Sequence, residues 1–207
     1  LTRGSPLKRI FFFAIPFLLG NLFQQFYNVV DMVIVGRTVG TLAYAAVGST
    51  GSLVWFASGA IQSLTVGFSV VTAHHFGSGD GKKVKKSFAG AIKLSAIISI
   101  ALSVICVLCA HPMLKVMRTP ETLYDNAYSY IVWIFAGLIV TALFNLLSNM
   151  IRALGDSKTP LYFLVVSCVI NIVLDIVLIR GCQMGTAGAG LATVIAQLIS
   201  GFCCIVY

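Results

Sequence analysis

The chain has 207 residues, of which 58% are hydrophobic and only 10% are charged. In soluble domains about a quarter of all residues are charged, so this composition excludes a soluble domain and indicates an integral membrane protein. The net charge of +8 does not indicate a nucleic-acid partner, because the basic residues lie between apolar runs and not on one face of a soluble domain.

Six apolar stretches are each long enough to cross a bilayer, whose core needs roughly 20 residues of helix. The stretch "IISIALSVICVLCA" is apolar all round and does not alternate, which favours helices over the strands of a membrane barrel. We therefore predict an all-α integral membrane protein, a bundle of six transmembrane helices. In chain order, the predicted spans are residues 10–35, 52–76, 88–110, 127–151, 160–179 and 185–207.

Basic residues cluster in three of the segments that flank these stretches. Segments rich in Lys and Arg stay on the cytoplasmic side, so we predict a multi-pass protein of the cell inner (plasma) membrane with a cytoplasmic N-terminus. Because the chain begins without Met and stops inside an apolar run, we expect it to be part of a longer protein. The residues that indicate this orientation are Arg3, Lys8, Arg9, Lys82, Lys83, Lys85, Lys86, Arg152 and Lys158.

Polar side chains recur at helical spacing inside several predicted spans. In the first, Gln24, Tyr27 and Asp31 are three and four residues apart and share one helix face. Because lipid penalises such stripes, they indicate a shared interior that surrounds water or a substrate. The other stripes are Ser167, Asn171 and Asp175; Thr141, Asn145 and Asn149; Gln62 and Ser69; and Thr193 and Gln197.

Three of these polar groups are predicted at one depth in the membrane. With the orientation above and a rise of about 1.5 Å per residue, Asp31, Asp175 and Thr193 all fall in its outer half. Carboxylate, amide and hydroxyl oxygens are hard ligands that hold Na⁺ or share a proton, and Asn171 lies one turn from Asp175. The alternative is that Asn171 and Asp175 only hydrogen-bond a neighbouring helix.

Pro16 removes a backbone hydrogen bond within the first span, so we expect either a fixed kink or a moving hinge there. The three histidines have no partner at metal-ligand spacing. We therefore predict no metal site beyond a Na⁺ site, no cofactor and no catalytic residue.

Several motifs together resemble the N-terminal lobe of multidrug and toxic compound extrusion (MATE) transporters. The resemblance runs along essentially the whole chain, and the motifs stand in the expected order. It implies one six-helix lobe of a pseudo-symmetric twelve-helix transporter, with the C-terminal lobe absent from this chain. The motifs are "VDMVIVGR", "RALGDSKTP", "VINIVLDIVLI" and "GAGLATVIAQ".

The resemblance implies secondary active efflux, in which cationic or amphiphilic drugs are exchanged for Na⁺ or H⁺. Asp31 matches the acid of the family's first helix, and Asn171 and Asp175 match the pair of its fifth helix. Thr193 matches a hydroxyl position used in some members' cation sites. The implied partners are such drugs, the lipid bilayer and the C-terminal lobe of the same transporter.

The resemblance gives three further residues a supporting role. Gln24, Tyr27 and Asn145 are expected to support the cation ligands or to contact drugs in the substrate cavity. The choice between Na⁺ and H⁺ stays open, because two acids with an amide serve both ions.

Two other functions remain open at this point. A lipid-linked saccharide flippase of the same superfamily would have a strongly basic cavity, whereas the interior charges here are mostly acidic, with Lys93 the one basic residue inside a predicted span. A non-transporting membrane scaffold with a single lobe would not need aligned carboxylates.

Overall fold

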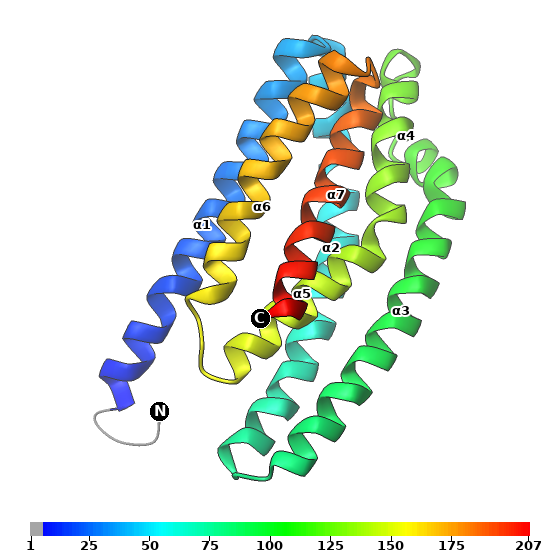
Figure 1. Ribbon diagram of the computed structural model, residues 1–207. Coiled ribbons are helices and arrows are strands. Elements are labelled where there is room, and N and C mark those ends of the chain that lie inside the picture. Colours follow the sequence, from blue (N-terminus) through cyan, green and yellow to red (C-terminus); the bar gives the residue numbers. More distant parts are fainter. Residues whose placement is uncertain (1–5) are drawn as a thin grey trace.

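The computed structural model describes residues 6–207, with side chains from residue 11 onward except that of residue 13. Arg3 lies outside the described residues, and so do the side chains of Lys8 and Arg9. Within the described part, every regular element is a helix (Figure 1). The elements are α1 (Pro6–Thr38), α2 (Thr41–Gly77), α3 (Gly81–Val116), α4 (Glu121–Ala136), α5 (Leu138–Ala153), α6 (Thr159–Ile176), the π-helix η1 (Val177–Gly181) and α7 (Gly185–Val206).

The helices extend beyond the apolar stretches of the sequence. The basic residues 82–86, expected to lie between two spans, form the first turns of α3. The carboxylate of Asp80 caps this helix by accepting a hydrogen bond from the Lys83 backbone N–H at 3.0 Å, and it pairs with Lys83 Nζ at 3.1 Å. A hydropathy pattern marks only the apolar part of a helix, so it cannot show a polar first turn that a cap stabilises.

Four helical runs in the described chain are long and apolar enough to cross a membrane, namely α2, α3, α6 with η1, and α7. The pair α4 and α5 makes a fifth if it is taken as one span, and it is bent by 47°. The predicted fourth span, residues 127–151, is therefore not one straight helix.

The bend lies at Gly137, between α4 and α5. Ser103 of α3 reaches into it, and its hydroxyl donates to the carbonyl of Phe135 at 2.8 Å and lies 3.4 Å from that of Ala136. A hydrogen-bonding side chain inserted into a helical ladder is a common cause of kinks, because it satisfies carbonyls that the break leaves free. The bend thus has its own polar partner within the bundle.

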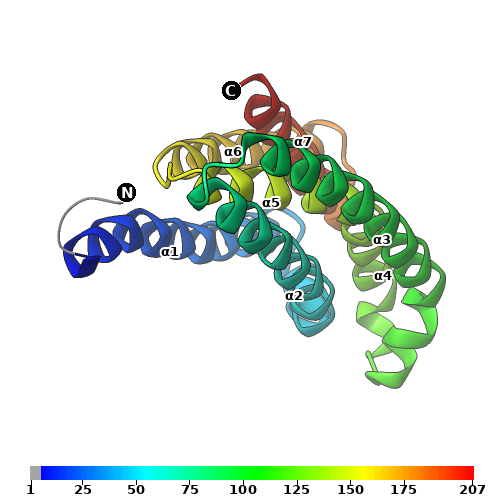
Figure 2. The same cartoon turned by 90° about the horizontal axis from the view of Figure 1, so that it is seen from below.

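The described helices form a curved layer (Figure 2). Seen from below, α1 and α6 lie on one side and α3 and α4 on the other, with α5 and α7 between them. The main apolar core joins α2, α3, α4 and α5 around fully buried side chains such as Ile61, Leu114 and Phe135. This core holds one half of the layer rigid, while α1 packs mainly along α6 and α2.

Helices α4 and α7 approach each other closely at Gly190. A Cβ atom at this position would lie 2.9 Å from the carbonyl oxygen of Tyr130 and 2.9 Å from Cβ of Trp133. Both distances are shorter than Cβ contacts tolerate, and one neighbour is backbone. Only glycine therefore allows the two helices to cross this closely. The crossing also fixes the position of α7, the helix that carries Thr193.

We expect Gly190→Ala to lower the melting temperature of the full-length transporter in detergent. Forcing a methyl group into a packed contact costs roughly 1–3 kcal/mol. The matched control is Gly67→Ala on α2, where an added Cβ meets nothing within 4 Å. This variant should melt at the wild-type temperature or above it, because alanine favours helix. Equal melting temperatures for the two variants would contradict the close crossing.

Candidate cation and substrate site

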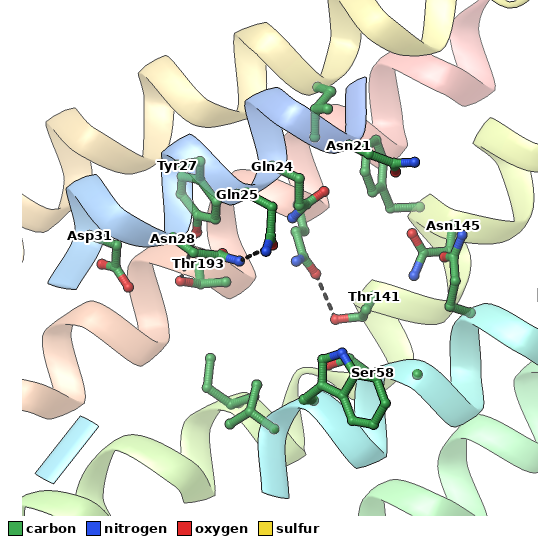
Figure 3. A pocket seen from close by; sticks show the side chains of 18 of the residues that line it. Asn21, Gln24, Gln25, Tyr27, Asn28, Asp31, Ser58, Thr141, Asn145 and Thr193 are labelled. Carbon is green, nitrogen blue, oxygen red and sulfur yellow. Dashed lines mark hydrogen bonds between the residues drawn. The ribbon is translucent and has the colours of Figure 1, made fainter. Parts of the chain in front are cut away.

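A polar cleft of about 640 Å³ lies between α1 and α2. Side chains of α5 and α7 form most of the rest of its wall. In Figure 3, the labelled side chains of α1 face Ser58 of α2 and Thr141 and Asn145 of α5 across this space. Seven residues are expected from the sequence to bind the cation, to support its ligands or to contact drugs, and the structure places five of them on the cleft wall: Gln24, Tyr27, Asp31, Asn145 and Thr193.

The other two expected cation ligands, Asn171 and Asp175, do not line the cleft. They lie on the buried face of α6, and both have a relative exposure of 0%. Asp31 is also buried, at 6% exposure, but one side of it reaches the cleft. The predicted ligands thus form a cluster that extends from the cleft wall into the space between α1, α6 and α7.

Hydrogen bonds connect this cluster across three helices. The hydroxyl groups of Tyr27 on α1 and Thr193 on α7 are 3.1 Å apart. The amide of Asn171 is best oriented with its nitrogen toward Asp175, because it then donates to Asp175 Oδ2 at 3.0 Å and its oxygen accepts from Tyr27 Oη at 3.3 Å. One amide therefore joins an acid of its own helix to a tyrosine of α1.

The two acids lie next to each other. The carboxyl groups of Asp31 and Asp175 are within hydrogen-bonding reach, so a single proton can bridge them. Among the described residues, Oδ1 of each is buried without a hydrogen-bond partner. The ion pair between Lys83 and Asp80 is the only one in the described part of the chain, so neither buried acid has a basic partner. The pair is therefore suited to hold a proton or a small cation.

The remaining polar stripes divide between the cleft and the core. The hydroxyl of Thr141 donates to Gln197 Oε1 at 2.6 Å, and both residues line the cleft, as does Gln62. Asn149 does not line it but is buried and donates to Thr65 Oγ1 at 3.1 Å. Ser69, two helical turns after Gln62 on α2, does not line the cleft. Helical spacing therefore predicts a polar face correctly but not which of its members meet the cleft.

The sequence reasoning missed several lining residues, such as Asn28 and Ser58, and it assigned Arg152 only to membrane orientation. In the structure Arg152 belongs to the last turn of α5 and lines the cleft. Its distance of seven residues from Asn145 is two helical turns, so the stripe of that helix could have been continued to it. The helical spacing thus indicated that Arg152 shares a face with Asn145, but its position next to a basic segment favoured the orientation role.

The backbone has two special positions near the cluster. Helix α1 continues across Pro16 without interruption. Directly after Asp175, α6 changes into the π-helix η1. Single π-turns are uncommon and occur often at functional sites. The predicted fifth span is thus helical throughout but not α-helical to its end.

Comparison with known proteins gives a consistent result. Residues 16–177 match the protein family MatE. YpnP and YoeA of Bacillus subtilis (strain 168), each described as a "probable multidrug resistance protein", are 29% and 30% identical over 96% and 100% of this chain. A protein of Shewanella oneidensis described as "FAD transporter" is 23% identical over 95% of it. The chain spans about half the length of these relatives, 45%, 45% and 44%.

Solved structures show the same fold. "Crystal structure of MATE in the bent conformation" superposes with a TM-score of 0.88 at 25% identity, over 99% of this chain and 45% of that one. "Crystal structure of MATE in the straight conformation" gives a TM-score of 0.87 over 98% and 45%. The chain belongs to the MatE family of multidrug and toxic compound extrusion transporters, which are multi-pass membrane proteins and not enzymes. It matches about half of such a transporter, as one lobe does.

We expect Asn171→Leu to destabilise the full-length transporter. The substitution keeps the volume of the side chain but removes the amide that donates to Asp175 Oδ2, and it leaves Tyr27 Oη with Thr193 as its one partner. An unsatisfied buried group costs about 1–3 kcal/mol. Asp175→Asn serves as the comparison, because it removes a buried charge and keeps the shape. Melting temperatures in detergent should fall for Asn171→Leu and stay level or rise for Asp175→Asn, and the opposite order would contradict this hydrogen-bond network.

Proposed function

We propose that this chain is the cation-binding lobe of a secondary active transporter that exports cationic or amphiphilic drugs in exchange for Na⁺ or H⁺. The observation that carries the proposal is the pair of buried acids, Asp31 and Asp175, beside a polar cleft. Two carboxylates in a low-dielectric interior repel each other, and no basic group of the described chain offsets that repulsion. A bound proton or cation offsets it, so the pair acts as the coupling-ion site.

The cleft supports the substrate side of the proposal. Its wall combines apolar side chains such as Phe17, Trp55 and Phe144 with a few polar groups. This wall suits amphiphiles, because few polar contacts are enough to orient such a ligand in an apolar pocket. Gln24 and Asn145 face it and make no side-chain hydrogen bond to the described residues, so they are free to contact a substrate. The relatives differ in the substrates for which they are described, from drugs to FAD, so the lining residues decide what this cleft accepts.

Ion binding is coupled to drug export if the ion changes the position of α1. Tyr27 and Asp31 on α1 contact the groups of α6 and α7 in the ion site, and the same helix lines the cleft. Ion binding favours whichever α1 position brings Asp31 closest to Asp175, since a ligand shifts an equilibrium by its differential affinity for the two states. Pro16, which lacks a backbone N–H, is the position where α1 bends most easily.

The proposal includes an orientation in the plasma membrane and a second lobe. The N-terminus and the turn between α2 and α3 are cytoplasmic, because that turn leads into four lysines. We expect a single cysteine introduced at Lys82, in a variant without the native cysteines, to react with a membrane-impermeant thiol reagent only from the cytoplasmic side. Labelling from outside would reverse the orientation.

Two alternatives fit less well. A flippase for lipid-linked saccharides needs a basic cavity to hold phosphates, but the described cleft wall has one acid, Asp31, and one basic residue, Arg152. A scaffold that does not transport has no use for two buried acids without a basic partner. Neither explains the acid pair, so efflux is the function that the site supports best.

We expect Asp175→Asn and Asp31→Asn each to abolish gradient-driven efflux by the full-length transporter in proteoliposomes. Each variant keeps the shape of its side chain and removes the charge that the coupling ion neutralises. Because the two acids act as one unit, the double variant should be scarcely worse than either single one. Imposing Na⁺ and pH gradients separately identifies the coupling ion.

The matched control is Asp125→Asn, which removes an exposed acid of α4 that does not line the cleft. This variant should transport at the wild-type rate. Wild-type efflux by both single variants at equal expression would reject the acid pair as the ion site and leave Asp175 with a purely structural role.

A further inference from the structure

The inner wall of the cleft contains an arginine that no acid neutralises. Arg152 Nη1 donates to Asn149 Oδ1 at 2.9 Å, and its guanidinium lies 5.5 Å from the centre of the Phe17 ring. Its Nε is buried and has no hydrogen-bond partner among the described residues. The side chain as a whole is only partly buried and lines the cleft, so it can contact a bound molecule.

The neighbouring residues hold this guanidinium in place without satisfying it. Asn149, its one hydrogen-bond partner in the described chain, is itself fixed by its bond to Thr65 Oγ1 of α2. The nearest acid along the chain, Asp156, accepts hydrogen bonds from the Lys158 backbone N–H at 2.9 Å and from Tyr207 Oη at 3.0 Å. Leaving a partly buried charged group without a counter-ion is costly.

A simpler explanation accounts for the charge but not for its placement. A basic residue in the last turn of a helix interacts favourably with the helix dipole, and it also contributes to membrane orientation. Lys158, which is exposed and does not line the cleft, meets the orientation requirement equally well. Neither role requires a guanidinium that is held by an anchored amide and faces the cleft.

We propose that Arg152 forms a subsite for an anionic oxygen group, a carboxylate or a phosphate, at the inner end of the cleft. The planar fork of arginine binds both kinds of group through two parallel hydrogen bonds. Asn145, two turns before it on the same helix, adds a free amide on the same side. The inference rests on the proposed efflux function and adds a class of substrate, amphiphiles with an acidic group.

The two charged positions of the cleft are well separated. Arg152 lies beside Phe17, and Asp31 is fourteen residues further along α1, which corresponds to about 21 Å. Figure 3 shows Asn145 at the end of the cleft away from Asp31. An acidic group at Arg152 therefore stays clear of the negative charge of the ion site. A zwitterionic amphiphile can enter with its acid toward Arg152 and its cationic part toward the amides in between.

A pair of dyes that differ in one group tests this subsite. A rhodamine methyl ester is a cation, and the corresponding free acid has the same ring system with a carboxylate. Proteoliposomes containing the full-length transporter should show an apparent affinity for the free acid that falls about tenfold or more in Arg152→Gln, the loss expected for one charge-assisted hydrogen-bonded pair. Transport of the ester should change less than about twofold.

Two further variants separate charge, geometry and folding. Arg152→Lys keeps the charge but loses the fork, and it should recover part of the affinity for the free acid. Lys158→Gln removes a basic residue near the same end of α5 outside the cleft, and it should transport both dyes as the wild type does. An equal loss for both dyes in Arg152→Gln, or an unchanged affinity for the free acid, would overturn the subsite.

The membrane composition distinguishes the two sources of the anionic group. The dyes are compared in liposomes of phosphatidylcholine alone and with added phosphatidylglycerol. If anionic lipid weakens uptake of the free acid in the wild type but not in Arg152→Gln, a lipid phosphate also occupies the subsite, which supports it. If the wild type transports neither dye, efflux itself is rejected, and dye fluorescence with purified wild type and Arg152→Gln in detergent still decides whether Arg152 binds the carboxylate.

Discussion

Two carboxylates buried side by side without a basic partner are the constraint around which this lobe is arranged. Asp31 comes from α1, Asp175 from α6, and the hydroxyl of Thr193 that completes the cluster comes from α7. A protein interior tolerates such a pair only with an ion that neutralises it or with a structure that can move the acids apart. Three helices thereby share the cost of burying these polar and acidic groups.

The other half of the lobe provides rigidity. There α2, α3, α4 and α5 pack around a continuous apolar core, and even the bend at Gly137 has its own hydrogen-bond partner in Ser103. The helices beside the acids have special backbone features of their own, a proline inside α1 and a π-helix that begins two residues after Asp175. The acids and the cleft therefore lie at the edge of the main apolar core and not within it.

Much of this organisation could be predicted from the sequence, because membrane insertion leaves a strong pattern. The apolar runs predicted the helices, and spacing of three and four residues predicted that Gln24, Tyr27 and Asp31 share a face. The sequence could not predict the bend, since Ser103 is distant along the chain, or the π-turn, which has no composition signal. It also did not indicate that Arg152 lines the cleft, because a positive charge near a helix end is already explained by the helix dipole and by membrane orientation.

The length of α2 and α3 has a consequence for how the protein meets its surroundings. Helix α2 contains 37 residues and therefore measures about 55 Å, and α3 with 36 residues is nearly as long. The hydrocarbon core is only about 30 Å thick, and even a tilt of about 40° leaves each helix longer than that. The hairpin they form therefore extends past the hydrocarbon core, and its turn at residues 78–80 lies at least at the level of the headgroups. An antibody fragment directed at this turn would bind the protein without touching the helices inside the hydrocarbon core.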